Sequence, residues 1–284
     1  ITYEPETQDT VWHVCLSKAG EVISERPISV ADGPSIHECS LTEDYIIVFD
    51  LPVTLSMAAL AQGFHFPFRW NARHAARVGL LPRRGTVEEI IWCDVDPCYV
   101  FHVANSFQNT DGSVTIDCCA YESMFAHGPD GPNGVPCGFE RWHVDPEKRR
   151  VTRAAIDPSA QEFPRIDERR FGQSYRHAWV VSQPREAVSN FVAQNALYHH
   201  DLETGEKRRH DFGPDQVGGE FVFIPRAPDA DEADGWLMGL VIDARNDSTQ
   251  LQFFEALDIE KGPVGAVHIP HRIPPGFHGN WIPD

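Results

Sequence analysis

Apolar residues along the chain fall in short runs that are rich in β-branched and aromatic side chains and bounded by turn residues. The clearest runs span residues 45–49, 89–93, 99–103, 114–118, 220–224 and 236–242. Runs of about five residues with this composition favour β-strands over helices. The best helical candidate, residues 55–62, is short, and strands do not alternate with long helices as they would in a doubly wound sheet. The pattern therefore predicts an all-β fold.

Three segments share an apolar strand that ends in an aspartate, a polar turn and a second strand. Their aspartates are Asp145, Asp201 and Asp258, with separations of 56 (201 − 145) and 57 (258 − 201) residues. A hairpin that recurs with a period of about 50 residues indicates propeller blades, although unrelated hairpins give the same local pattern. Each aspartate is expected to bond the backbone of its turn. The stretches 129–136 and 229–234 fit surface loops, so we expect residues 1–284 to form a single domain.

Composition and charge narrow the function classes. The chain has 24 Lys and Arg against 42 Asp and Glu, a formal charge of −18, which disfavours nucleic-acid binding. The 42% hydrophobic content argues against disorder, and no apolar stretch approaches the roughly 18 residues of a membrane-spanning helix. Seven cysteines, an adjacent pair at Cys118 and Cys119, and no CxxC pair favour reduced thiols in a cytoplasmic protein. Residue 1 is Ile, so we expect the natural start to lie upstream.

Fourteen histidines are many for this length, and most are expected to be structural or exposed. Strand alternation should send some of those on hairpin strands, such as residues 199–200, to solvent. Three others differ in context. His102 lies inside an apolar strand, where an imidazole must be bonded or coordinated. His37 precedes the strand at residues 45–49, and His278 is closely flanked by glycines; each of the three, taken singly, also fits a hydrogen-bonded core histidine.

Five segments in order resemble motifs of the carotenoid cleavage oxygenases. The segment Ile36-His-Glu-Cys-Ser-Leu-Thr-Glu-Asp-Tyr-Ile-Ile-Val-Phe-Asp-Leu-Pro52 resembles the surroundings of one iron-binding histidine of that family. Pro97-Cys-Tyr-Val-Phe-His-Val-Ala-Asn105 resembles the next, and residues 270–281 resemble the C-terminal one. Between them, Glu162-Phe-Pro-Arg-Ile-Asp167 and residues 219–225 match in the same order. The resemblance therefore extends over most of the chain.

This resemblance implies a seven-bladed β-propeller with loops and short helices capping one face, of which the chain would cover the C-terminal blades. It implies a ferrous ion held by histidines on the propeller axis, here His37, His102 and His278, and cleavage of a carbon–carbon double bond with O2. Glu162 and Glu220 would bond the far nitrogens of His102 and His278, respectively. Such carboxylates fix the tautomer and ring angle of a ligand histidine. No catalytic residue is expected beyond the metal site.

Two departures from the family pattern stand out. Where the family often has His-Asp-Phe, this chain has His37-Glu38-Cys39, which replaces a short acid by a longer one. The family's fourth histidine has no counterpart in a matching motif, so we expect it upstream of residue 1. With three ligands alone, the 284-residue chain is expected to bind iron weakly or not at all.

The resemblance implies a hydrophobic alkene as substrate, a carotenoid or apocarotenoid, with a stilbenoid as the alternative. Phe64, Phe66 and Phe68 lie in an apolar segment that follows residues 50–53, where family members carry part of a membrane-facing patch. One interpretation is a substrate entrance that dips into a bilayer, which would make the cytoplasmic protein peripheral to the membrane. The alternative is a short helix and loop packed on the propeller. The −18 charge disfavours attraction to anionic lipids.

Three rival functions remain open from the sequence. One is an isomerohydrolase of the same family that acts on retinoid esters, and another is a non-catalytic propeller that binds partners. The third is a calcium-dependent propeller hydrolase, which would place oxygen ligands at the axis. The apolar setting of His102 favours iron over calcium. The oligomeric state is left open.

Overall fold

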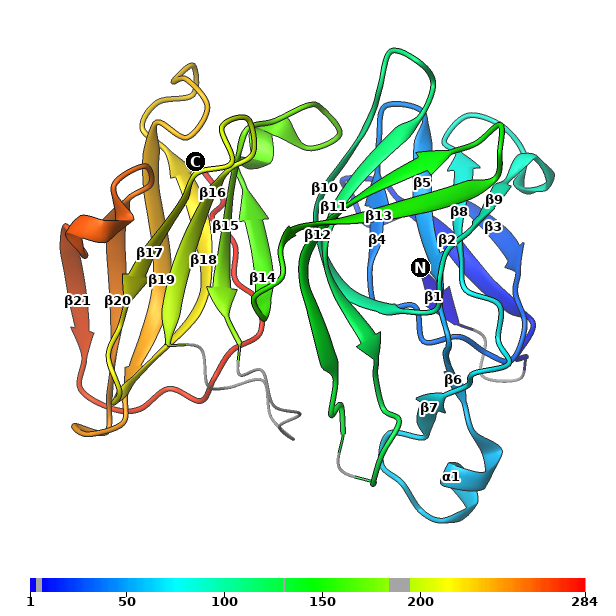
Figure 1. The fold of residues 1–284 in the computed structure, drawn as a ribbon, viewed down its shortest axis with the longest axis horizontal. Helices are drawn as coiled ribbons and strands as arrows, with labels where there is room; N and C mark the ends of the chain where they lie inside the picture. Colours follow the sequence, from blue (N-terminus) through cyan, green and yellow to red (C-terminus); the bar gives the residue numbers. More distant parts are fainter. Residues whose placement is uncertain (4–6, 130, 184–194, 284) are drawn as a thin grey trace.

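The computed structural model describes residues 1–3, 7–129, 131–183 and 195–283. Strands dominate this part of the chain (Figure 1). The elements of the N-terminal half are β1 (Thr2–Tyr3), β2 (Thr10–Leu16), β3 (Val22–Ser29), β4 (Cys39–Leu41), β5 (Tyr45–Asp50), β6 (Val53–Leu55), α1 (Met57–Ala61), β7 (Phe68–Trp70), β8 (Arg77–Pro82), β9 (Ile91–Asp94), β10 (Tyr99–Gln108) and β11 (Val114–Ser123). Those of the C-terminal half are β12 (Val135–Asp145), β13 (Arg150–Asp157), β14 (Gln161–Ile166), β15 (His177–Ser182), β16 (Ala196–Asp201), β17 (Lys207–Asp211), β18 (Gln216–Pro225), β19 (Gly235–Asp243), β20 (Ser248–Glu255) and β21 (Gly265–Ile269).

The strands form antiparallel sheets that follow one another along the chain. The first sheet is β1–β3, and an eight-stranded sheet follows with the order β10-β11-β12-β13-β9-β8-β5-β4. Its two halves, β4, β5, β8 and β9 and then β10–β13, are called the second and third sheets below, and the fourth and fifth sheets are β14–β17 and β18–β21. A single parallel pair, Arg150 with Asp94, joins the outer strands of the second and third sheets. The hairpin β6–β7 stands apart and carries α1 at its tip, at the bottom of Figure 1.

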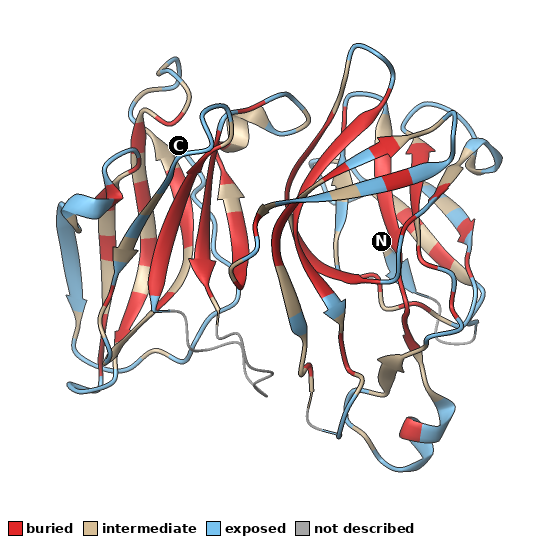
Figure 2. Ribbon diagram, in the orientation of Figure 1, coloured by how far each residue is buried: buried red, intermediate tan, exposed pale blue. Residues whose placement is uncertain are grey.

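A separate apolar core fills each space between consecutive sheets. Ile28 and Val48 pack between the first and second sheets. Between the second and third sheets, the rings of Phe49 and Trp142 pack with their centroids 6.2 Å apart. Phe139 belongs to the core between the third and fourth sheets. Trp179 stacks on Phe223 at 5.3 Å between the fourth and fifth. Figure 2 shows the buried residues concentrated on the strands. Face-to-face sheets in chain order confirm the predicted all-β propeller fold.

The first strands of four successive sheets lie side by side. β4 neighbours β10, β10 neighbours β14, and β14 neighbours β18. Residues at the same level of these strands therefore face one shared cavity, and a residue from each of several sheets can reach the same point. This arrangement is what positions the candidate site.

Each of the six predicted strands lies in or overlaps an observed strand, and the predicted helix is confirmed as α1. The side chain of Ser56 caps that helix by accepting a hydrogen bond from the backbone N–H of Ala59. Asp145, Asp201 and Asp258 all lie between the third and fourth strands of their sheets, as the repeat predicts.

The turn chemistry of the repeat differs at its last member. Asp145 and Asp201 each accept backbone N–H groups of the turn that follows. Asp258 makes no such bond, and its carboxylate instead pairs with Lys261 at 2.8 Å. The backbone bond expected at Asp258 is therefore wrong, because a 3-10 helix, Ile259–Lys261, replaces the tight turn.

The adjacent cysteines are explained by strand alternation. Cys118 and Cys119 are both fully buried on β11, but Cys118 packs in the core between the second and third sheets and Cys119 in the core between the third and fourth. All seven cysteines are free thiols. Burial raises the pKa of both thiols well above the usual range, so they remain protonated.

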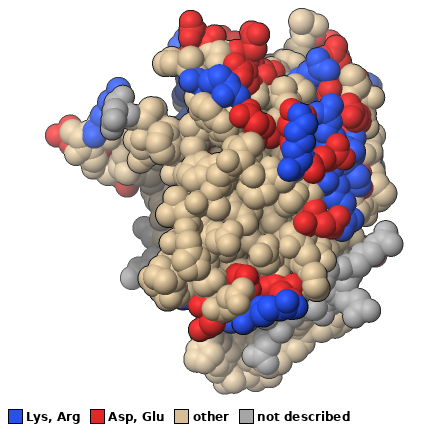
Figure 3. Space-filling view, turned by 90° about the vertical axis from the view of Figure 1, so that its left-hand side faces the viewer, with Lys and Arg blue, Asp and Glu red and all other residues tan. Residues whose placement is uncertain are grey.

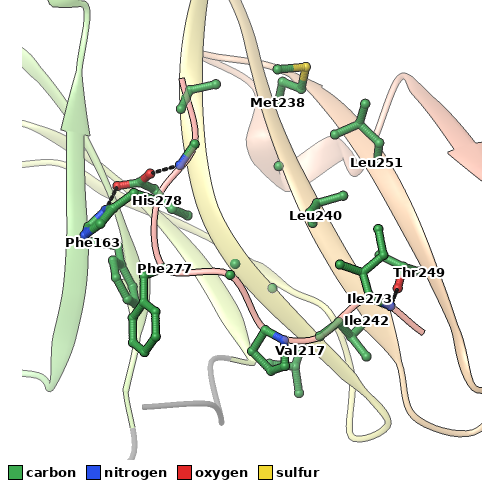
Figure 4. A pocket seen from close by; sticks show the side chains of 18 of the residues that line it. Phe163, Val217, Met238, Leu240, Ile242, Thr249, Leu251, Ile273, Phe277 and His278 are labelled. Atoms are coloured by element: carbon green, nitrogen blue, oxygen red, sulfur yellow. Dashed lines mark hydrogen bonds and ion pairs between the residues drawn. The ribbon is translucent and has the colours of Figure 1, made fainter. Parts of the chain in front are cut away.

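The fifth sheet is apolar on both faces. Leu237 and Val241 face the fourth sheet, whereas Met238, Leu240 and Leu251 line a cavity of about 260 Å³ on the opposite side. The C-terminal tail covers this cavity, as Figure 4 shows. Figure 3 views the side of the molecule where β21 lies, and few charged side chains occupy its centre. Among the described residues, none of the helices has the length and apolar character needed to cross a bilayer.

Candidate metal centre

Three histidines that are far apart in the sequence meet in the shared cavity. His37 lies just before β4, and His102 lies on β10. His278 lies on the C-terminal tail, as Figure 4 shows. One nitrogen of each ring lies within 4.8 Å of one nitrogen of both other rings. The ring centroid of His102 is 5.3 Å from that of His37 and 4.8 Å from that of His278. Within the described part of the chain, this is the one cluster of His, Cys, Asp or Glu with such a geometry.

Irregular pairing in the inner strands accompanies the site residues. Residues 101–102 of β10, 163–164 of β14 and 219–220 of β18 each lie opposite a single residue of the next strand. Such bulges re-aim side chains and are frequent beside active sites. In β14 the bulge places Phe163 at a φ of 51°, which turns its backbone N–H toward the preceding side chain. The same device thus recurs on three neighbouring strands, at or beside His102, Glu162 and Glu220.

The carboxylate of Glu162 is the partner of His102 Nδ1. Its Oε2 lies 2.5 Å from His102 Nδ1 and accepts a second hydrogen bond from the backbone N–H of Phe163 at 2.6 Å. Its Oε1 lies 2.9 Å from the hydroxyl of Tyr121. The carboxylate is fully buried, and His102 is 9% exposed, so solvent has little access to this pair.

The carboxylate of Glu220 is, in a similar way, the partner of His278 Nδ1. Its Oε1 lies 3.2 Å from His278 Nδ1, and its Oε2 accepts the backbone N–H of Gly279 at 3.0 Å. Arg165 approaches Oε1 at 3.6 Å and also reaches the carbonyl of Gly279 and the side chain of Asn280. The tail that carries His278 is therefore tied to the inner strands β14 and β18.

These contacts decide the tautomers of two histidines. A carboxylate only accepts, so Nδ1 of His102 and of His278 must carry the hydrogen, and Nε2 of each neutral ring presents a lone pair. The two Nε2 atoms face each other at 3.2 Å. Two lone pairs at this distance repel unless a proton or a metal ion lies between them. The donor set therefore fits a metal ion, and imidazole nitrogens suit Fe(II) and other transition metals.

The pKa shifts of His37 and His102 bear on whether the cluster can hold a metal ion. Burial, helped by the nearby His102, lowers the pKa of His37 to about 4, so this ring is neutral at pH 7 although one side is open to the cavity. Burial lowers the pKa of His102 as well, but the charge and hydrogen bond of Glu162 outweigh it and the net pKa is raised. A proton and a metal thus compete for the pocket that Glu162 makes favourable for positive charge.

Comparison with known proteins establishes the family. The family model described as RPE65, retinal pigment epithelial membrane protein, matches residues 1–283. The chain belongs to this family. A carotenoid cleavage oxygenase of Mycobacterium tuberculosis is 33% identical over 90% of the chain, and an isoeugenol monooxygenase of Pseudomonas nitroreducens is 26% identical over 99%. The predicted resemblance to carotenoid cleavage oxygenases is confirmed.

Solved structures agree with this assignment. An apocarotenoid oxygenase of Synechocystis in its cobalt-substituted form aligns with a TM-score of 0.84 and 26% identity, covering 96% of the chain and 58% of the other protein. A lignostilbene dioxygenase of Pseudomonas brassicacearum shares the fold, with a TM-score of 0.86 and 24% identity over 98% of the chain and 61% of its own. The chain spans about 60% of the length of these two proteins and of the M. tuberculosis relative.

The three phenylalanines of the expected entrance are less exposed than the sequence suggested. Phe66 is 43% exposed, whereas Phe64 and Phe68 are half-buried, Phe68 against the core of the second and third sheets. The exposed apolar side chains here are Phe66 together with Met57 and Leu60 of α1. α1 and the hairpin β6–β7 thus leave one apolar side in solvent, and the membrane-facing entrance stays a prediction.

Sequence reasoning missed two residues of the centre. Arg165 lies inside a motif that resembles the family, but nothing in its local sequence shows that its guanidinium reaches the C-terminal tail 114 residues later. Tyr121 follows the apolar residues 118–120 of β11, which give no sign of a polar partner, and its contact with Glu162 spans 41 residues. Both contacts depend on the packing of neighbouring sheets.

Proposed function

We propose that the complete protein is an Fe(II)-dependent oxygenase that cleaves a carbon–carbon double bond of an apolar alkene to carbonyl products. His37, His102 and His278 would hold the iron. The observation that carries this proposal is the pair of Nε2 atoms, 3.2 Å apart, in two rings whose Nδ1 atoms each face a buried carboxylate. When bound, Fe(II) would supply the redox chemistry by which O2 reacts with an alkene.

The protein's own groups supply orientation and exclusion of water. Glu162 and Glu220 hold the two tautomers and partly offset the positive charge of the metal. Phe101, Phe163 and Phe277 line the cavity and present apolar faces beside the histidines. An alkene without hydrogen-bonding groups would be placed by contact with these rings, and no acid or base is needed to activate it.

The aromatic lining favours an extended, apolar substrate. The rings of Phe66, Phe125, Phe101 and His37 follow one another with centroid distances of 4.8, 6.2 and 4.9 Å. This row links the exposed surface near α1 to the metal site. A carotenoid or apocarotenoid suits an aromatic environment of this kind, and relatives named for carotenoid cleavage support this choice. A stilbenoid is the second candidate, because one relative is named isoeugenol monooxygenase and a protein of the same fold is named lignostilbene dioxygenase.

The test uses the full-length protein loaded with Fe(II) under 18O2. One set of reactions contains an apocarotenoid and the other a hydroxylated stilbene, and the products are analysed by mass spectrometry. Cleavage to labelled carbonyl compounds supports the proposal, and the set that reacts faster identifies the substrate class. Isomerised or hydrolysed retinoid esters without cleavage would favour the isomerohydrolase, and absence of both metal and turnover would favour a non-catalytic binding module.

We also propose that the protein is cytoplasmic and makes peripheral contact with a membrane. Met57 and Leu60 of α1 and the neighbouring Phe66 are 57%, 49% and 43% exposed and form an apolar surface at the start of the aromatic row. Replacing all three by Ser is expected to reduce flotation with neutral phosphatidylcholine vesicles. The matched control is Phe171→Ser, since Phe171 is 48% exposed but lies elsewhere, after the 3-10 helix Glu168–Arg170. Equal flotation of both variants and the parent protein would remove the membrane proposal.

A further inference from the structure

The hydroxyl of Tyr121 is the third hydrogen-bond partner of the Glu162 carboxylate. It lies 2.9 Å from Oε1, whereas His102 and the backbone N–H of Phe163 both lie at Oε2. Tyr121 is 2% exposed and Glu162 is not exposed at all, so water does not reach the contact easily. Both oxygens of the carboxylate thus have hydrogen-bond partners, and Tyr121 is the one of these three partners that lies at Oε1.

The direction of this hydrogen bond follows from a proton count. Tyr121 also lies 3.0 Å from Gln183 Oε1, but its hydroxyl has one hydrogen and an ionised carboxylate has none. The hydrogen therefore points at Glu162. Gln183 Nε2 is buried and has no hydrogen-bond partner among the described residues, and exchanging the oxygen and nitrogen of that amide satisfies both groups. Gln183 then donates to Tyr121, and Tyr121 donates to Glu162.

Glu220, the other carboxylate of the site, shows the same plan with one difference. The Glu220 carboxylate lies within hydrogen-bond distance of His278 Nδ1 and accepts a hydrogen bond from one backbone N–H. Its third partner is the side chain of Arg165, with which it forms an ion pair. The third partner is a cation at Glu220 and a neutral hydroxyl at Glu162. Arg165 also pairs with Glu168 at 2.5 Å, whereas Tyr121 is a neutral donor that orients the Glu162 carboxylate without cancelling its charge.

We propose that Tyr121 is a positioning residue for metal binding. Its hydroxyl fixes the Glu162 carboxylate as the acceptor for His102 Nδ1 and thereby directs His102 Nε2 toward the metal. The inference rests on the proposed metal site. Without the hydroxyl, Oε1 is a buried carboxylate oxygen with no donor, and the carboxylate is free to rotate. His102 then loses its fixed acceptor.

The test compares Tyr121→Phe with Tyr175→Phe in the full-length protein. Tyr175 is a matched control, because it is also buried and its hydroxyl lies 2.7 Å from a buried carboxylate, that of Asp117, outside the metal site. The probe is Co(II), measured by competition titration and by its visible absorption spectrum. Tyr121→Phe is expected to weaken Co(II) binding about tenfold, at the low end of the range for outer partners of metal ligands, and to shift the spectrum. Tyr175→Phe is expected to change neither.

A double-mutant cycle separates positioning from general destabilisation. In a Glu162→Gln background, Tyr121→Phe is expected to have no further effect on Co(II) affinity, whereas a purely structural role would give the same loss in both backgrounds. If Tyr121→Phe does not fold, Gln183→Leu removes the outer donor and is expected to weaken binding by a smaller factor. Unchanged affinity and spectrum in the folded variant would overturn the inference and leave the metal site intact. Absence of Co(II) and Fe(II) binding in the parent protein would overturn the proposed function and this inference together.

Discussion

Acid is expected to destabilise the fold through His200, which lies behind the metal site. His200 is on β16 and 4% exposed, and its Nε2 lies 2.7 Å from Oε1 of Gln161. Gln161 directs its amide nitrogen at Ser159, so its oxygen accepts and the imidazole donates from Nε2. Gln161 directly precedes Glu162 on β14. Protonation of His200 at Nδ1 therefore places a buried positive charge beside the strand that carries the acceptor of His102.

The magnitude follows from the pKa of this group. Burial lowers the pKa of His200 from 6.5 to about 4. A depressed histidine pKa means that the unfolded chain takes up a proton below about pH 6.5 while the folded chain does not. Stability is therefore complete above pH 6.5 and is lost as the pH falls toward 4. At pH 5 the difference amounts to about 2 kcal/mol of unfolding free energy, from 1.36 kcal/mol for each pKa unit.

The assay is urea unfolding of the full-length protein at pH 7.5 and pH 5, followed by tryptophan fluorescence. His200→Gln keeps an amide donor but does not titrate, so its unfolding free energy is expected to fall between these pH values by about 2 kcal/mol less than that of the parent. His65→Gln, at an exposed loop position, is the control and is expected to behave like the parent. Identical pH dependence of the parent and His200→Gln would refute the argument from burial.

Two further variants test contacts around the site. Arg165→Met removes the cation that lies 3.6 Å from Glu220 and bonds the C-terminal tail, so Co(II) affinity is expected to fall about tenfold; unchanged affinity in a competition titration would contradict a role for this contact. Gly138→Ala places a Cβ 2.2 Å from the carbonyl oxygen of Asp157 at a φ of 105°, and is expected to cost about 2–4 kcal/mol in urea unfolding. Gly112→Ala, at positive φ in open space, should cost only about 1 kcal/mol, and equal losses would show that the clash is relieved.

The fold class and the histidine cluster could be predicted because their signals are local. Short β-branched runs specify strands, and the unusual setting of His102 in an apolar strand is visible in nine residues of sequence. The order of the motifs, which resembles that of the family, then selected His37, His102 and His278 among the fourteen histidines. The structure places His37, His102 and His278 around one point, which spacing alone would not have shown.

Features that depend on packing between sheets were not visible. Alternation suggested that some histidines on hairpin strands face solvent, and His143 does, but His199 and His200 are both buried. They lie on β16, every residue of which is buried, because sheets cover both of its faces. The bulges of the inner strands and the bond from Tyr121 to Glu162 likewise arise from tertiary contacts, and no residue pattern marks them.

The central claim is that His37, His102 and His278 hold iron, and iron content tests it most directly. The full-length protein and its His102→Ala variant would be reconstituted anaerobically with Fe(II), desalted and analysed for metal and protein. The account expects about one iron for each parent polypeptide, with most of it lost in the variant, since a ligand and the partner of Glu162 are removed together. Equal iron in both proteins, or none in the parent, would contradict it.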